Sequence, residues 1–97
     1  MNKVFCDTAW EQYCYWQEYD KKILKKINTL LKDIERNGAL NGLGKPEALR
    51  GDLNGLCSRR INAEHRLVYY TDAANIYVVA CKTHYGEQWH KYLLKSL

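Results

Sequence analysis

The second half of the chain carries the side chains that could perform chemistry. Glu47 follows Pro46, the only proline, and His84 lies just beyond an apolar run that ends at Cys81. Arginine presents a planar fork of donors that binds phosphate oxygens in pairs and stays charged at any working pH. Four arginines fall within 17 positions of this half, namely Arg50, Arg59, Arg60 and Arg66. A carboxylate, an imidazole and clustered guanidinium groups together suit the cleavage of a phosphodiester.

This set of groups can cleave RNA without a metal ion or another cofactor. The 2′-OH attacks the adjacent phosphate if a base takes its proton, an acid protonates the leaving 5′-oxygen, and positive charge neutralises the phosphorane. Glu47 is the candidate base, and His84 is the candidate acid because imidazole titrates near neutrality. Arg66 is the candidate for stabilising the phosphorane, together with Arg60. The candidate substrate-binding residues are Lys45, Arg50, Arg59 and Arg60, which would hold phosphates, and Tyr85, which would stack on a base.

Several of these residues also have a structural interpretation. Glu47 could instead pair with Arg50 on the surface. His65 directly precedes an expected strand, so a structural role or a phosphate contact is favoured there over catalysis. Trp10 and Trp16 are interpreted as anchors of the first helix or of a subunit contact rather than as ligand contacts.

Length and composition indicate one packed domain over residues 1–97. The hydrophobic content of 46% is enough for a core, which argues against a disordered chain. The net charge is +4, distributed as −3 over residues 1–20, +4 over residues 21–36 and +3 over residues 37–97. A basic protein of this kind can bind nucleic acid, an acidic protein or an anionic membrane. The lysines of residues 21–36 equally suit a solvated helix face.

The amino-terminal residues and the cysteines indicate a cytoplasmic protein. Residues 1–7 lack the apolar run of a signal peptide, and no stretch approaches the ~18 apolar residues of a membrane span. The cysteines show no C-x-x-C spacing and no metal-ligand rhythm. In a reducing compartment they are expected to be small buried hydrophobes. They are Cys6, Cys14, Cys57 and Cys81.

The first third of the chain predicts a strand and two helices. A short strand over residues 3–7 is followed by a helix that reaches Tyr19. Thr8 and Glu11 have the spacing of a capping box at its start. Asp20 is positioned to cap the second helix, whose isoleucines and leucines recur on one stripe.

The rest of the chain predicts a loop, four strands and a terminal helix. The second helix ends at residues 37–38, and residues 38–48 hold three glycines and the proline, as in a loop. Tyr69 and Tyr70 are neighbours in a strand, so one of them should be core. The order indicates an α+β domain, with a helix pair on one face of a mainly antiparallel sheet of four or five strands and the other face free for function. The expected strands lie at about residues 48–52, 57–62, 66–71 and 75–82, and the expected helix at about residues 86–96.

Motifs along the chain resemble those of the YoeB branch of the RelE-like bacterial toxins. The resemblance covers about residues 1–85. It implies the RelE-like microbial ribonuclease fold, a homodimer, cleavage of A-site codons of messenger RNA on the ribosome, and neutralisation by a YefM-like antitoxin with an acidic, disordered C-terminal segment. The matching segments are Trp10 and residues 13–17 (YCYWQ), 25–28 (KKIN), 44–47 (GKPE), 53–55 (LNG), 58–61 (SRRI), 64–69 (EHRLVY) and 84–85 (HY).

The resemblance also implies roles for individual residues. In that family the residue matching Glu47 is the general base, the residue matching His84 is the general acid, and the residue matching Arg66 stabilises the transition state. The residues that position the RNA match Lys45, Arg50, Arg60 and Tyr85.

Two features depart from the family pattern. Residues 86–97 form a C-terminal extension beyond the point where relatives stop, and Cys57 stands where they carry a large aromatic residue. Neither change removes a proposed catalytic group, although the extension could either cover His84 and Tyr85 or leave them open. We therefore predict a ribosome-dependent messenger RNA endoribonuclease. The alternatives are a catalytically inactive RNA- or ribosome-binding module of the same fold, and a partner that only sequesters an antitoxin.

Overall fold

The computed structural model describes residues 1–83, which form two helices and a five-stranded sheet. This is the α+β arrangement expected from the sequence. The terminal helix expected at residues 86–96 lies outside the described residues. In chain order the elements are β1 Asn2–Phe5, α1 Asp7–Tyr19, α2 Lys21–Asn37, β2 Glu47–Ala48, a 3₁₀ turn at Gly51–Leu53, β3 Cys57–Arg60, β4 Arg66–Thr71 and β5 Asn75–Ala80.

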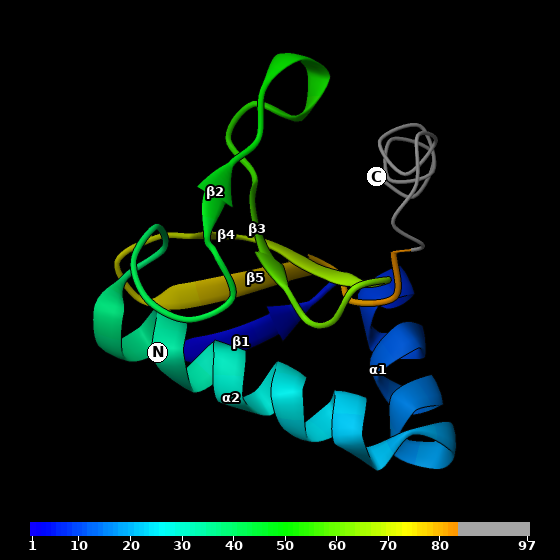
Figure 1. Cartoon of the computed structure of the whole chain (residues 1–97). Helices are drawn as coiled ribbons and strands as arrows, with labels where there is room; N and C mark the ends of the chain where they lie inside the picture. The colour runs from blue at the N-terminus through cyan, green and yellow to red at the C-terminus, as the bar shows by residue number, and fades with distance from the viewer. Residues whose placement is uncertain (84–97) are drawn as a thin grey trace.

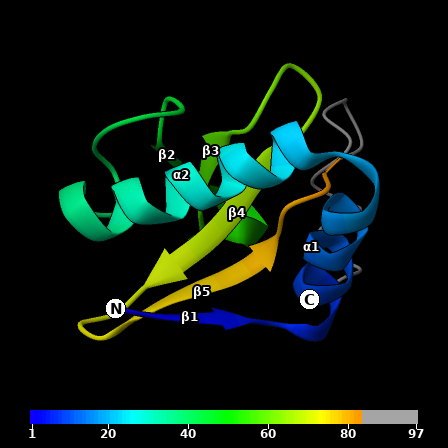
Figure 2. The ribbon, with the colours of Figure 1, turned by 90° about the horizontal axis from the view of Figure 1, so that it is seen from below.

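The sheet is mixed, with one parallel pair at its edge. Its order is β1-β5-β4-β3-β2, and all neighbours are antiparallel except β1 and β5. Both helices lie on the same side of this sheet, where α2 crosses the strands and α1 lies near one end of β5 (Figures 1 and 2). The three strands β2, β3 and β4 therefore present their opposite face away from the helices.

One face of α2 supplies most of the helical residues of the core. Its buried residues are spaced three or four positions apart, as the sequence predicts for one face of a helix. They pack against alternate residues of β4 and β5, which point to the helix side of the sheet. This cluster includes Ile27, Leu30, Leu31 and Ile34 of α2 together with Leu67, Tyr69, Ile76 and Val78 of the sheet.

A second, smaller core covers part of the face that was expected to be free. Residues 49–56, here called the arm, rise from this face between β2 and β3 (Figure 1). The strand predicted at residues 48–52 is wrong, because β2 ends at Ala48 and Gly51 adopts a left-handed φ of 64° that starts the 3₁₀ turn. The arm buries its leucines on the sheet through contacts among Leu49, Leu53, Val68, Val79 and Ala80, with Leu56 at the margin.

The helix ends match the sequence prediction in part. The Oδ1 oxygen of Asp20 accepts hydrogen bonds from the backbone N–H groups of Lys22 (3.1 Å) and Ile23 (3.2 Å), so the predicted cap of α2 is confirmed. The predicted capping box of α1 is wrong. α1 begins at Asp7, and Cys6 occupies the cap position without a side-chain hydrogen bond, which places Thr8 inside the first turn.

Burial corrects one expectation and confirms another. Tyr69 is fully buried and Tyr70 is exposed, as alternation along β4 requires. The cysteines are not uniformly buried, since Cys81 is buried but Cys6 is exposed at the end of an edge strand. Cys14 and Cys57 are intermediate. Within residues 1–83, neither helix has the length and apolarity to cross a membrane.

The turn between β4 and β5 depends on one carboxylate. Asp72 accepts hydrogen bonds from the backbone N–H groups of Ala74 (2.9 Å) and Asn75 (2.8 Å), and from the hydroxyl of Tyr77 (2.5 Å). The Tyr77 hydroxyl is the main reason why the pKa of Asp72 falls to about 2. The charged carboxylate is therefore favoured in the folded state.

We expect the Asp72→Asn variant to be less stable at neutral pH and less sensitive to acid. A lowered folded-state pKa gives stability that is complete above the unfolded pKa, ~4 for an aspartate, and is lost as the pH falls towards 2. Urea unfolding at several pH values between 7 and 2 would measure both effects. Asp52→Asn, at an exposed carboxylate of the arm, is the control. If the free energy of unfolding depends on pH in the same way for the wild type and for Asp72→Asn, the prediction is contradicted.

Candidate active site

Strand pairing brings two of the predicted catalytic residues together on the face away from the helices. Glu47 of β2 pairs with Ser58 of β3, and Arg60 of β3 pairs with Arg66 of β4. The Oε1 oxygen of Glu47 lies 3.5 Å from the Nη1 nitrogen of Arg66 and accepts a hydrogen bond from the Ser58 hydroxyl at 3.4 Å. The Glu47 side chain is 55% exposed, whereas that of Arg66 is only 7% exposed. An open carboxylate thus stands beside a guanidinium that is held by packing.

The start of β4 is joined to the residue before His84. The backbone N–H of Arg66 donates to the Thr83 hydroxyl at 2.8 Å, and this hydroxyl donates to the Arg66 carbonyl at 3.1 Å. Thr83 is fully buried. His84 and Tyr85, the predicted acid and stacking residue, lie outside the described residues. The contact nevertheless ties the end of the described chain to the backbone of the predicted catalytic arginine.

His65 has a supporting position in the same region. It is buried, and its Nδ1 nitrogen lies 3.2 Å from the Thr83 carbonyl oxygen. Its Nε2 nitrogen lies 3.0 Å from a carboxylate oxygen of Glu64, and its ring meets Trp16 edge-on at 5.0 Å between centroids. The sequence left open a structural role, a phosphate contact and catalysis for His65, and these contacts favour the structural role.

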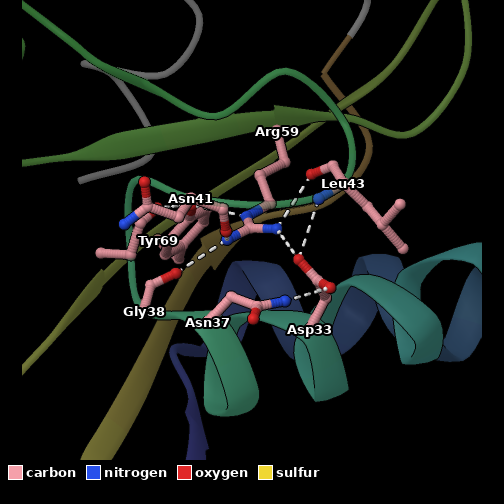
Figure 3. A network of polar contacts seen from close by, with 8 residues as sticks. Asp33, Asn37, Gly38, Asn41, Leu43, Arg59 and Tyr69 are labelled. Atoms are coloured by element: carbon pink, nitrogen blue, oxygen red, sulfur yellow. Dashed lines mark hydrogen bonds and ion pairs between the residues drawn. The ribbon is translucent and has the colours of Figure 1, made fainter.

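Arg59 corrects the predicted set of substrate-binding residues. It is fully buried on the helix side of β3, where it pairs with Asp33 of α2 at 2.5 Å and donates to the Tyr69 hydroxyl at 2.9 Å (Figure 3). Because side chains alternate across a strand, Arg59 and Arg60 point to opposite faces of the sheet. Arg59 is therefore unavailable to RNA. Its guanidinium also donates to the backbone carbonyls of Gly38 (2.8 Å), Asn41 (2.7 Å) and Leu43 (2.9 Å).

The other described candidates for RNA binding are exposed near Glu47. Lys45 has a φ of 50° and lies in the loop two residues before Glu47, and Arg50 is the second residue of the arm. Arg60 is exposed and lies opposite Arg66 in the register of β3 and β4. Two cations directly opposite each other in a sheet repel, so a bound phosphate would relieve an unfavourable interaction. Glu47 lies against Arg66 rather than in the surface pair with Arg50 that the sequence left open.

Two site residues were missed by the sequence analysis. Ser58 and Thr83 are buried hydroxyl residues whose partners come from other strands. Ser58 lies in β3 and Thr83 lies three residues after β5. A hydroxyl at either position carries no sequence signal for such a role, because its partners depend on the pairing of the strands. Among residues 1–83, no group of three or more histidines, cysteines or carboxylates lies close enough together to hold a metal ion.

The combined geometry suits a base and positive charge acting at one phosphate. A phosphate bound to Arg66 would lie within reach of Glu47, because the two side chains already approach to 3.5 Å. The exposure of Glu47 allows a ribose hydroxyl to approach it. The burial of Arg66 holds its guanidinium in place before a phosphate binds.

Sequence and structure comparisons identify the family. A family model described as a YoeB-like toxin of a bacterial type II toxin–antitoxin system matches residues 5–85. The chain belongs to this family. Toxin YoeB of Escherichia coli K12 is 47% identical over 85 residues, which is 88% of this chain and 100% of that protein. The E. coli toxin is thus matched over its whole length, whereas the chain continues to residue 97.

Solved structures of similar proteins agree with this assignment. A YoeB dimer from Staphylococcus aureus is 56% identical, with a TM-score of 0.83 over 88% of this chain and 98% of that one. The toxin in a heterotetrameric YoeB–YefM toxin–antitoxin complex from the same organism is also 56% identical, with a TM-score of 0.84 and the same coverage. The predicted YoeB resemblance and the predicted fold are therefore confirmed.

Proposed function

We propose that this YoeB-like toxin is an endoribonuclease that cleaves messenger RNA at A-site codons on the ribosome and thereby inhibits translation. The contact between Glu47 and Arg66 is the observation that carries the proposal, since it joins a solvent-accessible base to a fixed positive charge. The same face displays Arg60, and the exposed Lys45 lies two residues before Glu47 in the chain. The cytoplasm is the compartment in which such an enzyme meets its substrate.

In the proposed reaction Glu47 takes the proton of the 2′-OH. The 2′-oxygen forms a bond with phosphorus, and the bond between phosphorus and the 5′-oxygen breaks. Arg66 and Arg60 neutralise the charge of the phosphorane, and His84 gives its proton to the leaving 5′-oxygen. Lys45 and Arg50 hold neighbouring phosphates, and Tyr85 stacks on a base. The products are a 2′,3′-cyclic phosphate and a 5′-hydroxyl.

The ribosome has a physical role in this scheme. Glu47 is 55% exposed and makes two long contacts, at 3.4 and 3.5 Å, so the described part of the site is open and lightly constrained. A single-stranded message entering such a site has many orientations. The ribosome holds the A-site codon in a fixed conformation, and this removes part of the entropic cost of aligning the 2′-OH with Glu47.

We also propose that the toxin forms a homodimer and is neutralised by a YefM-like antitoxin. S. aureus relatives form a YoeB dimer and a YoeB–YefM heterotetramer. An acidic antitoxin segment would meet a chain whose net charge is +4.

A translating ribosome loaded with a defined message provides the test. We expect new 5′ ends in register with the reading frame and a 2′,3′-cyclic phosphate on the upstream fragment. A message with a 2′-deoxynucleotide at the scissile position should remain intact, because it lacks the attacking hydroxyl. Stalled translation without new 5′ ends would instead indicate an inactive binding module, and an unaffected ribosome would indicate a partner that acts only on an antitoxin.

A further inference from the structure

Glu47 is poorly fixed by its own strand. β2 contains only two residues, and the Glu47 carboxylate has only the long contacts to Ser58 and Arg66 within the described part of the chain. Its position therefore depends on the loop of residues 38–46 that connects α2 to β2.

Arg59 and its partners bind the backbone of this loop through hydrogen bonds. The guanidinium of Arg59 donates to three loop carbonyls, and the Oδ2 oxygen of Asp33 both pairs with Arg59 and accepts the backbone N–H of Leu43 at 2.9 Å (Figure 3). The Tyr69 hydroxyl adds a fifth anchoring hydrogen bond to the loop by donating to the Ala39 carbonyl at 2.5 Å. The loop backbone is pressed closely against this network, because a Cβ added at Gly42 would lie 2.0 Å from Asp33 Oδ2.

Only three residues separate the last of these anchors from Glu47, and they have little freedom. The Gly44 carbonyl accepts the backbone N–H of Arg60 at 2.6 Å. Gly44 and Lys45 have φ angles of 80° and 50°, which fold the chain sharply, and the ring of Pro46 fixes the next φ. A displacement of the loop at Leu43 would therefore also displace Glu47, because the three residues between them cannot adjust to it.

We propose that Arg59 is a positioning residue for the reaction, which acts by placing Glu47 against its substrate without touching RNA. This inference rests on the proposed function, in which Glu47 is the base. A buried ion pair is weak evidence for a net contribution to stability, since replacing both partners together by well-packed apolar residues often stabilises a fold as much or more, although removing one partner alone is costly. What Arg59 supplies that an apolar residue cannot is a set of directed hydrogen bonds to Asp33, Tyr69 and three loop carbonyls.

The test compares Arg59→Lys with the wild type in the cleavage of ribosome-bound message. Lysine keeps the charge, but its ammonium has three donors and no planar fork, so it cannot satisfy the five acceptors around Arg59. We expect kcat to fall about 10- to 100-fold, as for a catalytic group displaced by ~1 Å, with KM changed less than about 2-fold. Asp72→Asn is the control, because it weakens a turn outside the loop and should leave kcat unchanged at a temperature where both variants are folded.

A double-mutant cycle separates positioning from a merely structural effect. If Arg59 acts through Glu47, then Arg59→Lys should cause no further loss of single-turnover rate in a Glu47→Gln background. The same fall in rate in both backgrounds, or an unchanged kcat for Arg59→Lys alone, overturns the inference. If Arg59→Lys does not fold, Asp33→Asn replaces it, because it removes the charge partner but keeps a side-chain oxygen for the network. Failure of the wild type to cleave refutes the proposed function itself.

Discussion

The Glu47→Gln variant is expected to cleave ribosome-bound message about 10²- to 10⁴-fold more slowly than the wild type, the range typical for loss of a general base. Glutamine keeps the shape of the side chain and can still accept a hydrogen bond from Ser58, but it cannot take a proton from the 2′-OH. KM should stay the same or fall, because the carboxylate no longer competes with substrate phosphate for Arg66, 3.5 Å away. Single-turnover rates at several ribosome concentrations would separate the two parameters.

Stability distinguishes a lost base from a lost fold in this experiment. The Glu47 side chain is 55% exposed, so its substitution should change the free energy of unfolding by less than ~0.5 kcal/mol. Glu18→Gln, at an exposed carboxylate on α1, is the matched control and should cleave at the wild-type rate. Cleavage by Glu47→Gln at the wild-type rate would remove Glu47 from the mechanism.

The second large effect is expected from a comparison of two neighbouring arginines. Arg59→Met should lower the free energy of unfolding by about 3–5 kcal/mol, because it leaves Asp33 as an uncompensated charge and three loop carbonyls without a donor. Small domains are stable by only ~5–15 kcal/mol, so this variant should be close to unfolding. Arg60→Met, at the next residue and on the other face, should change stability by less than ~0.5 kcal/mol.

For RNA binding, Arg60 rather than Arg59 is the arginine whose substitution should have a direct effect. Arg60→Met removes an exposed cation opposite Arg66, so it should raise KM for ribosome-bound message and reduce the dependence of binding on salt. Urea unfolding and a salt titration of binding measure the two effects. Equal destabilisation by both substitutions would contradict the assignment of Arg59 to the core and Arg60 to the site.

The contrast between these arginines also shows where sequence reasoning stops. A run of Ser58, Arg59 and Arg60 predicts alternating directions in a strand, but it does not say which face is covered. The position of Ile61, two residues after Arg59 and also buried, is a signal for a core-facing Arg59. The partners that make its burial possible come from α2 and from the loop after it, and no local pattern indicates them.

Elements with a strong periodic pattern were predicted well. α2 and its cap at Asp20 follow from the spacing of isoleucine and leucine and from one side chain. The start of α1 and the arm were predicted wrongly, because they depend on small local preferences. At the arm, a left-handed Gly51 and the burial of Leu53 outweigh the extended pattern of residues 48–52. The approach of Glu47 to Arg66 could be expected from their residue types and the resemblance, whereas the anchoring of Arg66 to Thr83 could not.

The position of β4 links the assembly of the fold to the assembly of the proposed catalytic centre. Leu67 and Tyr69 fill the helix-side core, Val68 supports the arm, and Arg66 meets Glu47. A slip of this strand by one residue would exchange its two sides, driving a guanidinium into the apolar layer and an aliphatic side chain towards the proposed RNA-binding face. Under the proposed function, a misregistered copy would therefore be inert as well as unstable.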